Sequence, residues 1–570
     1  MKQENDLKVL RHSAAHLLAH AVHELYPDTK LTIGPSTEEG FFYDCLPVHN
    51  FKEEDLIKIE ERMHEISKRN IKLEHKEIPK ALAREIYKDN PFKLELIDQI
   101  PGETAGLATQ GNFYDLCRGG HVESTGQIKY FKLLGISGAY WRADRSGTAL
   151  QRLSGTAFFS QKDLDEYLQR KEDLLKYDHR KLGKELDLFS FHEEGPGFVF
   201  YHPKGRAVFN ALVAYMRKIQ RGMGYAETLT PIILSDELWR RSGHYAHYKE
   251  NMYFTTIDDK QYAIKPMNCP GSILIYKSRP HSYRELPLRF SEFGLVHRHE
   301  LSGVLHGLLR VREFTQDDVH IYCTLEQLQG EILQIIKNAF DVLHKFGFEK
   351  ISVKLSTRPQ DSLGKDENDG LWQKATDSLK RALEIDKIDY TVDEGGGAFY
   401  GPKIDFKVED SMGREWQLVT IQADFFQPIN FDLTYVASGG QLERPVMVHS
   451  TIYGSLERFI AVILEHNKGN LPFFVAPVQI KILTITDEQK DYANKLLSIL
   501  KEHDIRAEID YSADQISSKI KSATLERVPW MFVIGKKEVE NNTITLRYRD
   551  GKQEFGLTIE NLLKKAKENL

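Results

Sequence analysis

The chain has 570 residues, of which 41% are hydrophobic and 28% are charged, and its formal net charge is −6. No apolar run approaches the roughly 20 residues that a membrane helix needs, and four cysteines are too few for a disulfide scaffold. The N-terminus is polar and unlike a secretory signal, and the net charge does not favour nucleic-acid binding through a global field. We therefore expect a cytoplasmic protein of several domains, in which an RNA partner would be held by local patches.

Residues 1–160 mix short helical and strand-like runs, which predicts an α+β domain. Near its start, His12 and His16 are spaced i and i+4, so they project from one face of a helix. Much later in the same region, Cys117 and His121 repeat that spacing. Two pairs of histidine or cysteine residues, each with this spacing, are typical of metal-binding sites. Two interpretations stay open: zinc ligands, structural or hydrolytic, or a metal-free site that positions water.

Residues 161–187 are dense in charge and carry apolar residues at helical spacing, among them Leu164, Leu168 and Leu175. This pattern predicts one amphipathic connector helix between two domains.

Residues 188–473 make up the largest predicted domain. A helix opens it, because Val208, Leu212, Tyr215 and Ile219 recur at helical spacing. Strand-like runs follow, which indicates a domain built on a large sheet.

The most informative segment lies in the middle of this domain. Arg298 and Glu300 are two residues apart, so on an extended strand they project from one face. After a loop that contains glycines, Arg310, Arg312 and Phe314 follow. Arginine forks match phosphate oxygens, a carboxylate accepts from the amine of adenine, and an aromatic ring stacks on a base. The segment is therefore a candidate nucleotide cradle without a P-loop, although a surface strand with ion pairs has the same spacing.

Residues 474–570 alternate between strand-like and helical runs, which predicts a small α/β domain closed by a helix. The predicted strands are 482–486, 507–510, 531–535 and 543–549.

Several of these segments resemble a known class of enzymes. The run from Arg298 through Glu300 and the loop to Phe314 resembles motif 2 of class II aminoacyl-tRNA synthetases. The helix at 205–223 and the run that ends at Pro231 resemble motif 1, and GSLERFI at 454–460 resembles motif 3. Within the class, the chain is similar almost throughout to the threonyl-tRNA synthetase family. The similar segments are KPMNCPG (265–271), RVREFTQDDVHIYC (310–323), AFYGPKIDF (398–406) and PVMVHSTIYGSLERF (445–459).

The resemblance implies an α+β multidomain fold. It places an α+β editing domain at 1–160, a class II catalytic core with an antiparallel sheet at 188–473, and an α/β anticodon-binding domain at 474–570. It implies ATP-dependent activation of L-threonine, transfer to tRNA(Thr) and hydrolysis of mischarged Ser-tRNA(Thr). Mg²⁺ would accompany ATP, and the class implies a homodimer. The family usually begins with a small ubiquitin-like domain, which we expect this chain to lack.

The resemblance also assigns the residues of the catalytic core. Those at the nucleotide are Arg298 at the α-phosphate, Lys403 at the reacting phosphate, Glu300 and Phe314 at adenine, and Arg310 and Arg458 at the outer phosphates. Those at the amino acid are Asp318, Tyr400, Gln422 and Gln316.

One zinc ion is implied by the resemblance, bound by Cys269, His320 and His449. From the residues alone these three are too dispersed to propose as ligands, and a buried cysteine or a hydrogen-bonded core histidine is the ordinary interpretation of each. In the family, three protein ligands leave open coordination on the zinc for the amino and hydroxyl groups of threonine.

The first 160 residues resemble the editing domain of threonyl- and alanyl-tRNA synthetases. The residues that match its site are His12, His16, Tyr43, Lys93, Asp115, Cys117 and His121. The alanyl relatives bind zinc there and bacterial threonyl enzymes work without it, so the metal stays open. For Lys93 a solvated surface lysine is the alternative. Gly120 replaces the usual proline, which predicts a less rigid loop before His121.

The C-terminal domain resembles an anticodon-binding domain, in which Glu538 and Arg547 would contact bases. Exposed Glu and Arg on neighbouring elements are otherwise simply solvated. The stretch 513–520 departs from the family pattern, which leaves another anticodon contact open.

Three other functions compete with this interpretation. A prolyl-type class II synthetase would share the C-terminal domain but lacks both the zinc trio and the editing domain. A non-catalytic RNA-binding paralogue would have eroded motifs, whereas Arg298, Glu300 and Arg458 are intact. A metallohydrolase built on the N-terminal histidines would leave most of the chain unexplained.

Overall fold

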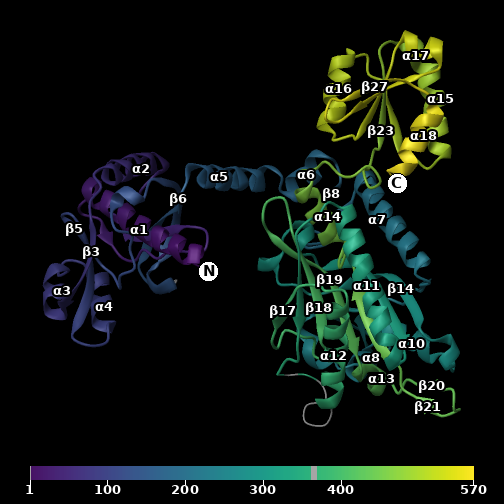
Figure 1. Ribbon diagram of the computed structural model, residues 1–570, viewed down its shortest axis with the longest axis horizontal. Coiled ribbons are helices and arrows are strands. Elements are labelled where there is room, and N and C mark those ends of the chain that lie inside the picture. The colour runs from purple at the N-terminus through teal and green to yellow at the C-terminus, as the bar shows by residue number, and fades with distance from the viewer. Residues whose placement is uncertain (1, 145, 361, 363–368, 570) are drawn as a thin grey trace. The chain divides into compact units, whose positions relative to one another are not determined.

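The computed structural model describes residues 2–144, 146–360, 362 and 369–569. The chain divides into two compact units, Met1–Glu172 and Asp173–Leu570, which are described separately (Figure 1). Among the described residues, no helix combines the length and the apolar character needed to cross a membrane.

The first unit packs its N-terminal helix, α1, against a four-stranded antiparallel sheet of order β1-β2-β7-β6. Apolar residues of α1, including Leu10, Leu17 and Leu18, are fully buried in this core. A second antiparallel sheet, β3-β4-β5, carries two short helices. The helices are α1 (Lys2–Leu25), α2 (Glu53–Lys68), α3 (Lys80–Ile86) and α4 (Pro91–Gln99). The strands are β1 (Lys30–Leu31), β2 (Phe41–Leu46), β3 (Leu73–Pro79), β4 (Thr104–Gln110), β5 (Phe113–Leu116), β6 (Tyr130–Tyr140) and β7 (Ala149–Phe158).

The predicted connector helix is two helices, α5 (Gln161–Lys176) and α6 (His179–Glu185), so the expectation of one continuous helix is wrong. Asp178 is the reason for the second start, because its side chain accepts a hydrogen bond from the backbone N–H of Arg180 at 2.8 Å. That is the N-cap bond that satisfies a free donor at the beginning of a helix.

The second unit is built on an eight-stranded sheet of order β10-β14-β15-β22-β19-β18-β16-β17. Its inner pairings are antiparallel and only the two outermost pairings are parallel, which confirms the predicted antiparallel class II core. The strands are β10 (Ala226–Glu227), β14 (Leu288–His297), β15 (Glu313–Cys323), β16 (Ile351–Ser356), β17 (Tyr390–Asp393), β18 (Lys403–Glu409), β19 (Glu415–Asp424) and β22 (Val446–Thr451).

Helices cover one face of this sheet and bury the largest core of the unit (Figure 1). Side chains alternate along a strand, so Val446 and Val448 of β22 join that core while His449 points to the opposite face. The helices are α7 (Pro203–Gly222), α8 (Asp236–Arg241), α9 (His244–Tyr248), α10 (Cys269–Lys277), α11 (Leu325–Lys345), α12 (Asp369–Ile385), α13 (Phe426–Asn430) and α14 (Leu456–His466). Smaller strands are β8 (Phe189–Ser190), β9 (Phe200–Tyr201), β11 (Ile233–Ser235), β12 (Tyr253–Ile257), β13 (Lys260–Ile264), β20 (Tyr435–Val436) and β21 (Leu442–Glu443).

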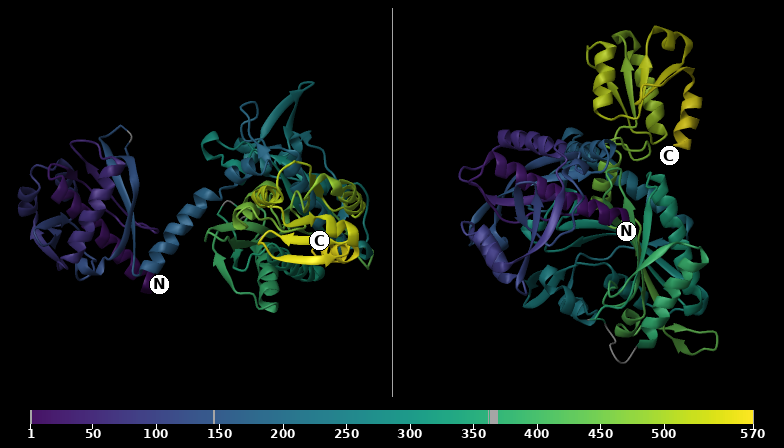
Figure 2. Two further views of the ribbon diagram at one scale, coloured as in Figure 1. Left: turned by 90° about the horizontal axis from the view of Figure 1, so that it is seen from above. Right: turned by 60° about the vertical axis from the view of Figure 1, so that its left-hand side comes forward.

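The C-terminal part of this unit has a five-stranded sheet of order β24-β23-β25-β26-β27 with helices around it (Figure 1, Figure 2). Its four predicted strands are present close to their expected bounds, and β27 is an additional strand. The strands are β23 (Ile480–Thr484), β24 (Ala507–Asp510), β25 (Trp530–Ile534), β26 (Ile544–Tyr548) and β27 (Gln553–Leu557). The helices are α15 (Lys490–Glu502), α16 (Ile516–Leu525), α17 (Lys536–Asn541) and α18 (Ile559–Glu568).

Candidate functional site

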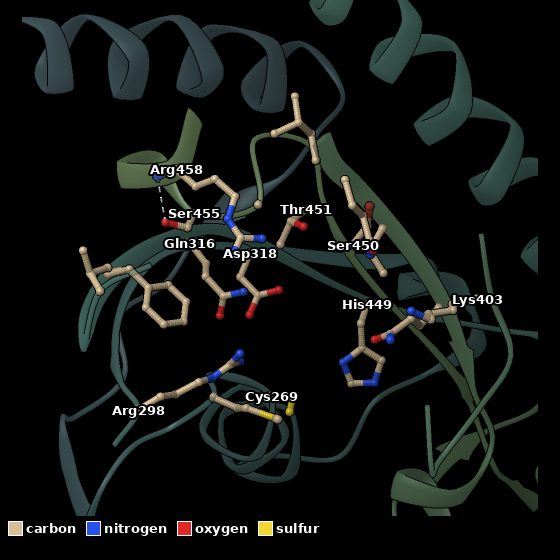
Figure 3. Close-up of a pocket in the computed structure, with 18 of the residues that line it drawn as sticks. Cys269, Arg298, Gln316, Asp318, Lys403, His449, Ser450, Thr451, Ser455 and Arg458 are labelled. Atoms are coloured by element: carbon tan, nitrogen blue, oxygen red, sulfur yellow. Dashed lines mark hydrogen bonds between the residues drawn. The ribbon is translucent and has the colours of Figure 1, made fainter. Parts of the chain in front are cut away.

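A cavity of about 540 Å³ opens on the face of the eight-stranded sheet opposite the core that α7, α11, α12 and α14 bury (Figure 3). It brings together all the residues that the sequence places at the nucleotide, the amino acid and the zinc ion. They are Cys269, Arg298, Glu300, Arg310, Phe314, Gln316, Asp318, His320, Tyr400, Lys403, Gln422, His449 and Arg458.

Two arginines from different elements extend into this cavity (Figure 3). Arg298 follows β14, and its guanidinium carbon lies 5.0 Å from the centre of the Phe314 ring. Arg458 lies on α14, and its Nε donates to the backbone oxygen of Leu309 at 3.1 Å. Two cations beside a partly buried aromatic ring that lines the cavity suit a phosphate chain that is attached to a flat base.

Glu300 and Arg310 form an ion pair of 3.1 Å between Oε2 and the guanidinium. Arg312, in contrast, donates to the backbone oxygens of Glu300 and Pro196 at 2.9 and 3.0 Å. Arg312 therefore holds the loop in place, whereas the Glu300–Arg310 pair lines the cavity.

The three predicted zinc ligands meet in the same cavity. The register of β15 and β22 pairs His320 with His449, and Cys269 begins α10. One ligand atom from each residue lies within 4.8 Å of the other two, and all three residues are buried. Within the part of the chain that the structure describes, the buried Nε2 of His320 has no hydrogen-bond partner.

The electrostatics of this trio are those of a metal site. Burial lowers the pKa of the His320 imidazole well below its ordinary value, which keeps the ring neutral and able to ligate. His449 Nε2 lies 2.8 Å from the carboxylate of Asp424, so its Nδ1 remains for a metal. A carboxylate that holds the far nitrogen of a ligand histidine is typical of zinc sites. One thiol and two imidazoles suit zinc, so the residues present fit the implied ion.

Hydrogen bonds also hold side chains that the sequence predicts at the amino acid, and an ion pair holds Lys403. The Tyr400 hydroxyl donates to the side-chain oxygen of Gln422 at 2.7 Å. Asp318 accepts from the Asn268 side chain at 3.1 Å, and burial raises its pKa to about 6. Lys403 forms an ion pair of 2.8 Å with Asp405.

Asp424 and Asn268 are contacts that the sequence analysis missed. Nothing in the local sequence marks them, because each acts on a residue that lies far away along the chain. Only the register of β19 with β22 could have indicated that Asp424 lies near His449.

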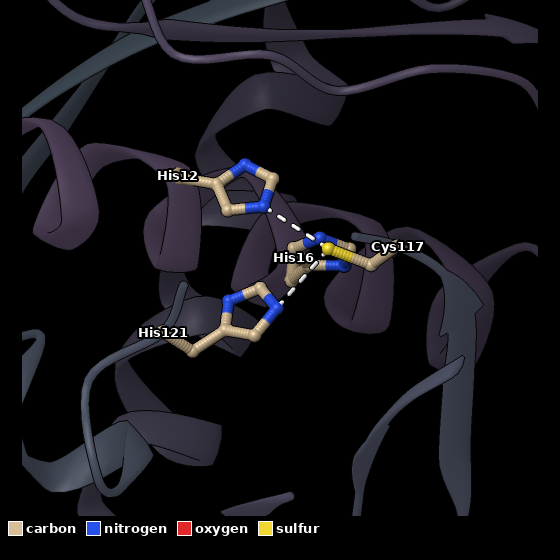
Figure 4. A group of neighbouring side chains, drawn as sticks. All are labelled: His12, His16, Cys117 and His121. Carbon is tan, nitrogen blue, oxygen red and sulfur yellow. Dashed lines mark hydrogen bonds between the residues drawn. The ribbon is translucent and has the colours of Figure 1, made fainter. Parts of the chain in front are cut away.

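The first unit holds a second cluster, in which the Cys117 sulfur lies between two histidines (Figure 4). His12 Nε2 is 3.1 Å and His121 Nε2 is 3.2 Å from this sulfur. His16 completes a set whose ligand atoms lie within 4.8 Å of one another. Both the zinc interpretation and the metal-free interpretation remain compatible with this geometry.

Asp115 stands behind this cluster and is almost fully buried. Its carboxylate accepts from the Tyr43 hydroxyl at 2.6 Å, lies 3.2 Å from His16 and pairs with Lys93. Lys93 is 2% exposed, so its surface alternative is wrong. The carboxylate needs this partner, because a buried charge without one is strongly destabilising.

The side chains of this cluster shift the pKa values of Cys117 and His16 in opposite directions. Burial disfavours the Cys117 thiolate, but the hydrogen bonds from His12, His121 and His16 outweigh it and lower the pKa of Cys117 to about 3. Burial likewise disfavours a charged His16, yet Asp115 and Cys117 raise the pKa of His16 to about 9. At neutral pH the metal-free site is thus a thiolate beside an imidazolium and a carboxylate.

Gly120 adopts a φ of +85° in the loop before His121. A proline is locked near −65°, so the residue usual in the family could not take this conformation. The substitution therefore accompanies a different local backbone, in addition to the loss of rigidity that the sequence predicts.

Three segments of the chain match known protein families. Residues 253–467 match the tRNA synthetase class II core domain (G, H, P, S and T), and residues 473–569 match the anticodon binding domain. Residues 106–154 match the threonyl and alanyl tRNA synthetase second additional domain.

Relatives match over nearly the whole chain. The threonine–tRNA ligase of Clostridium tetani is 53% identical over 549 residues, which cover 96% of this chain and 85% of that protein. The threonine–tRNA ligase of Acetivibrio thermocellus is 54% identical over 542 residues, which cover 95% of this chain and 85% of that protein. The chain belongs to the threonine–tRNA ligase family. A solved RNA binding domain of threonyl-tRNA synthetase from Cryptosporidium parvum Iowa II aligns with a TM-score of 0.66 and 41% identity, over 69% of this chain and 98% of that one.

This member of the threonine–tRNA ligase family is an enzyme with a class II catalytic core, and the prolyl-type and non-catalytic alternatives are not favoured. Its predicted anticodon residues are already engaged within the domain. Glu538 accepts from the Gly535 N–H and from the Thr545 hydroxyl, both at 2.9 Å. Arg547 donates to the Gly551 oxygen at 3.3 Å. A base contact would have to share or replace these bonds, so both assignments stay predictions.

Replacing Asp424 by asparagine should weaken zinc binding about 10–100-fold. Asparagine keeps the oxygen that accepts from the Phe426 and Gln427 N–H groups, but it puts an amide NH2 group, which donates, against His449 Nε2. Competition with a chelator measures the affinity. Asp432→Asn, at an exposed aspartate that pairs with Arg444, is the matched control and should bind zinc as the wild type does. Equal affinity of all three proteins would show that Asp424 does not hold His449 for the metal.

In metal-free protein, Cys117 should be a thiolate at mildly acid pH, between its pKa of about 3 and the value of about 8.5 for a free cysteine. Burial raises the pKa of Cys45 to about 12 and raises that of Cys269 well above its usual value, so these thiols should be silent. Ultraviolet thiolate absorbance should therefore disappear in Cys117→Ser. Absorbance that develops only in alkaline solution would contradict the charge distribution described above.

Proposed function

We propose that the cavity of the second unit joins L-threonine to tRNA(Thr) in two steps, activation by ATP to threonyl-adenylate and transfer to the terminal ribose of the tRNA. One observation carries the proposal. The Cys269, His320 and His449 trio lies in the same cavity as the facing pair Arg298 and Arg458. An amino-acid end and a phosphate end must adjoin for a carboxylate to attack a phosphate.

We assign the zinc ion to the trio at the amino-acid end. When bound, zinc would supply a Lewis acid for the polar groups of threonine. Asp424 orients His449, while Asp318 and the Tyr400–Gln422 pair surround the substrate. A site that holds a hydroxyl rejects valine, which lacks one, by roughly 10⁴ or more.

At the phosphate end, we assign Arg298 to the α-phosphate and Lys403 to the charge that develops on it. Glu300 and Phe314 take adenine, and Arg310 and Arg458 take the outer phosphates, which Mg²⁺ accompanies. Catalysis by these residues is positioning and electrostatic stabilisation, since their charges are fixed before the reaction begins. None of them needs to form a covalent intermediate.

Serine keeps both zinc-binding groups and loses only a methyl group, which is worth roughly 1–3 kcal/mol. We therefore assign the cluster of the first unit to hydrolysis of Ser-tRNA(Thr). Cys117, His12 and His121 would position water and the ester, while Asp115, Lys93 and Tyr43 hold His16 in place.

We propose that the chain acts as a homodimer, with the α7 region as the interface. A groove of about 420 Å³ beside α7 is lined by Phe209, Val213, Phe293 and Leu295. We also retain the domain bounds 1–160, 161–187, 188–473 and 474–570, the last for the anticodon.

Amino-acid-dependent exchange of pyrophosphate into ATP tests the synthetic reaction. We expect strong exchange with threonine, weaker exchange with serine and none with valine, and the activity should be lost on removal of zinc or in His320→Ala. Exchange that depends on proline would make the chain a prolyl-type enzyme. A folded, zinc-loaded protein that is silent with every amino acid would indicate a non-catalytic RNA-binding protein.

Deacylation of preformed Ser-tRNA(Thr) tests the editing assignment. Cys117→Ala should charge threonine normally and let Ser-tRNA(Thr) accumulate, because the sulfur at the centre of the cluster is lost. Cys45→Ala, at a buried cysteine of the same unit outside the cluster, is the control and should clear Ser-tRNA(Thr) normally. Normal clearance by Cys117→Ala would remove Cys117 from the site.

A further inference from the structure

His179 lies at the junction of three segments of the second unit. It begins α6, which packs beside α14, and its side chain is fully buried (Figure 1). Its Nδ1 lies 2.7 Å from the carboxylate of Glu465 on α14. Its Nε2 accepts the backbone N–H of Leu308 at 3.0 Å, in the loop between β14 and β15 that carries the nucleotide residues.

These bonds determine which tautomer is present. A backbone N–H can only donate, so Nε2 carries the lone pair and the proton is on Nδ1, which donates to Glu465. Asp178, His179 and Glu465 have the composition of a cation site. However, both ring nitrogens of His179 are already used, and Glu465 also pairs with Arg414. The cluster therefore connects α6 to α14 and to the loop between β14 and β15.

The loop is shaped to lie against this imidazole. Gly307 has a φ of +49°, and a Cβ at this position would lie 2.1 Å from His179 Nε2. A side chain at 307 would push the two apart, so the close approach requires glycine. The next two residues, Leu308 and Leu309, are buried.

The same loop is attached to α14 at a second point. The backbone oxygen of Leu309 accepts from Arg458 Nε at 3.1 Å, and Arg458 precedes Glu465 by two turns on one side of α14. The loop is thus bound to α14 directly through Arg458 and indirectly through His179. The first bond orients a guanidinium that lines the cavity.

We infer that His179 is a positioning residue for ATP: by accepting the Leu308 N–H it holds the loop at 307–309, and through the Leu309 oxygen it orients Arg458 toward the phosphates. It does not line the cavity, so it acts through these residues and not on the substrate. The inference rests on the proposed function of the cavity. It extends the nucleotide site to α6, the second helix of the connector.

Two substitutions separate the two bonds of the ring. Asparagine places an amide nitrogen where Nδ1 was, so His179→Asn keeps a donor for Glu465 and loses the acceptor for Leu308. Glutamine reaches the position of Nε2 with an oxygen, so His179→Gln keeps the acceptor and loses the donor. If His179 only stabilised the fold, both variants would lose ATP affinity to a similar degree. If His179 positions the loop, only His179→Asn loses ATP affinity.

The Kd for ATP, measured by calorimetry, and the KM values for ATP and threonine in pyrophosphate exchange test the inference. His179→Asn should weaken ATP binding about tenfold, because a buried N–H is left without its acceptor. Its KM for threonine should be unchanged, and His179→Gln should bind ATP nearly as the wild type does. Equal ATP affinity of the two variants, or a parallel change in both KM values, would overturn the inference.

Gly307→Ala disturbs the contact between the loop and His179 from the side of the loop. It tests the inference even if His179→Asn does not fold. Its methyl group displaces the loop from the imidazole, so the ATP affinity should fall while threonine binding is kept. His466→Asn and His466→Gln are matched controls. His466 follows Glu465 on α14 and uses its ring nitrogens on Ser411 and Gly347, away from the loop, so ATP affinity should not change.

These outcomes are separate from failure of the proposed function. If the wild type binds ATP but exchanges no pyrophosphate with any amino acid, the proposed function is wrong, and the Kd values still decide the role of His179. If the wild type exchanges with threonine and Gly307→Ala and His179→Asn bind ATP normally, only the inference is wrong.

Discussion

The pairing of β15 with β22 is the constraint on which the catalytic cavity depends. It places His320 directly opposite His449 on the face of the sheet turned away from the largest core, and α10, which packs on that face, brings Cys269 to both. The neighbouring pairing of β22 with β19 brings Asp424 and Gln422 to the same place. A shift of this register by one residue would turn His449 into the helical core and Val448 into the cavity. The amino-acid end therefore exists only in this register.

The two units divide one problem of selection between them. A single binding step can select for a hydroxyl group. When a substrate lacks the hydroxyl, the groups of the site that bind it are left without a partner. A missing methyl group cannot be recognised in this way, since its burial is worth only roughly 1–3 kcal/mol. We propose that the charged cluster around Cys117 in the first unit answers this need, because there it would act on the product after the first selection has been made.

Much of the fold and of the two candidate sites could be predicted from the sequence, because residue spacing determines local secondary structure. Strands of the C-terminal sheet, the helical pair His12 and His16, and the motif residues Arg298 and Arg458 could all be found from spacing or resemblance. The break between α5 and α6 could not, because the helical spacing continues past Asp178 and only its capping bond reveals the new start. Roles that depend on a distant partner were also missed. Asp424 and His179 contact residues that only the folded chain brings near, and for the same reason a surface position stayed open as the alternative for Lys93.

The most direct test of the account is the metal content and ligand set of the catalytic cavity. The double variant His12→Ala/Cys117→Ala takes two of the four candidate ligands from the cluster of the first unit, so zinc that remains is assigned to the cavity. Elemental analysis should find one zinc ion per chain in this variant, and X-ray absorption should show one sulfur and two imidazole ligands that Cys269→Ser alters. A folded variant without zinc, or with a metal whose ligands include no sulfur, would contradict the assignment of the trio and the selection by hydroxyl that rests on it.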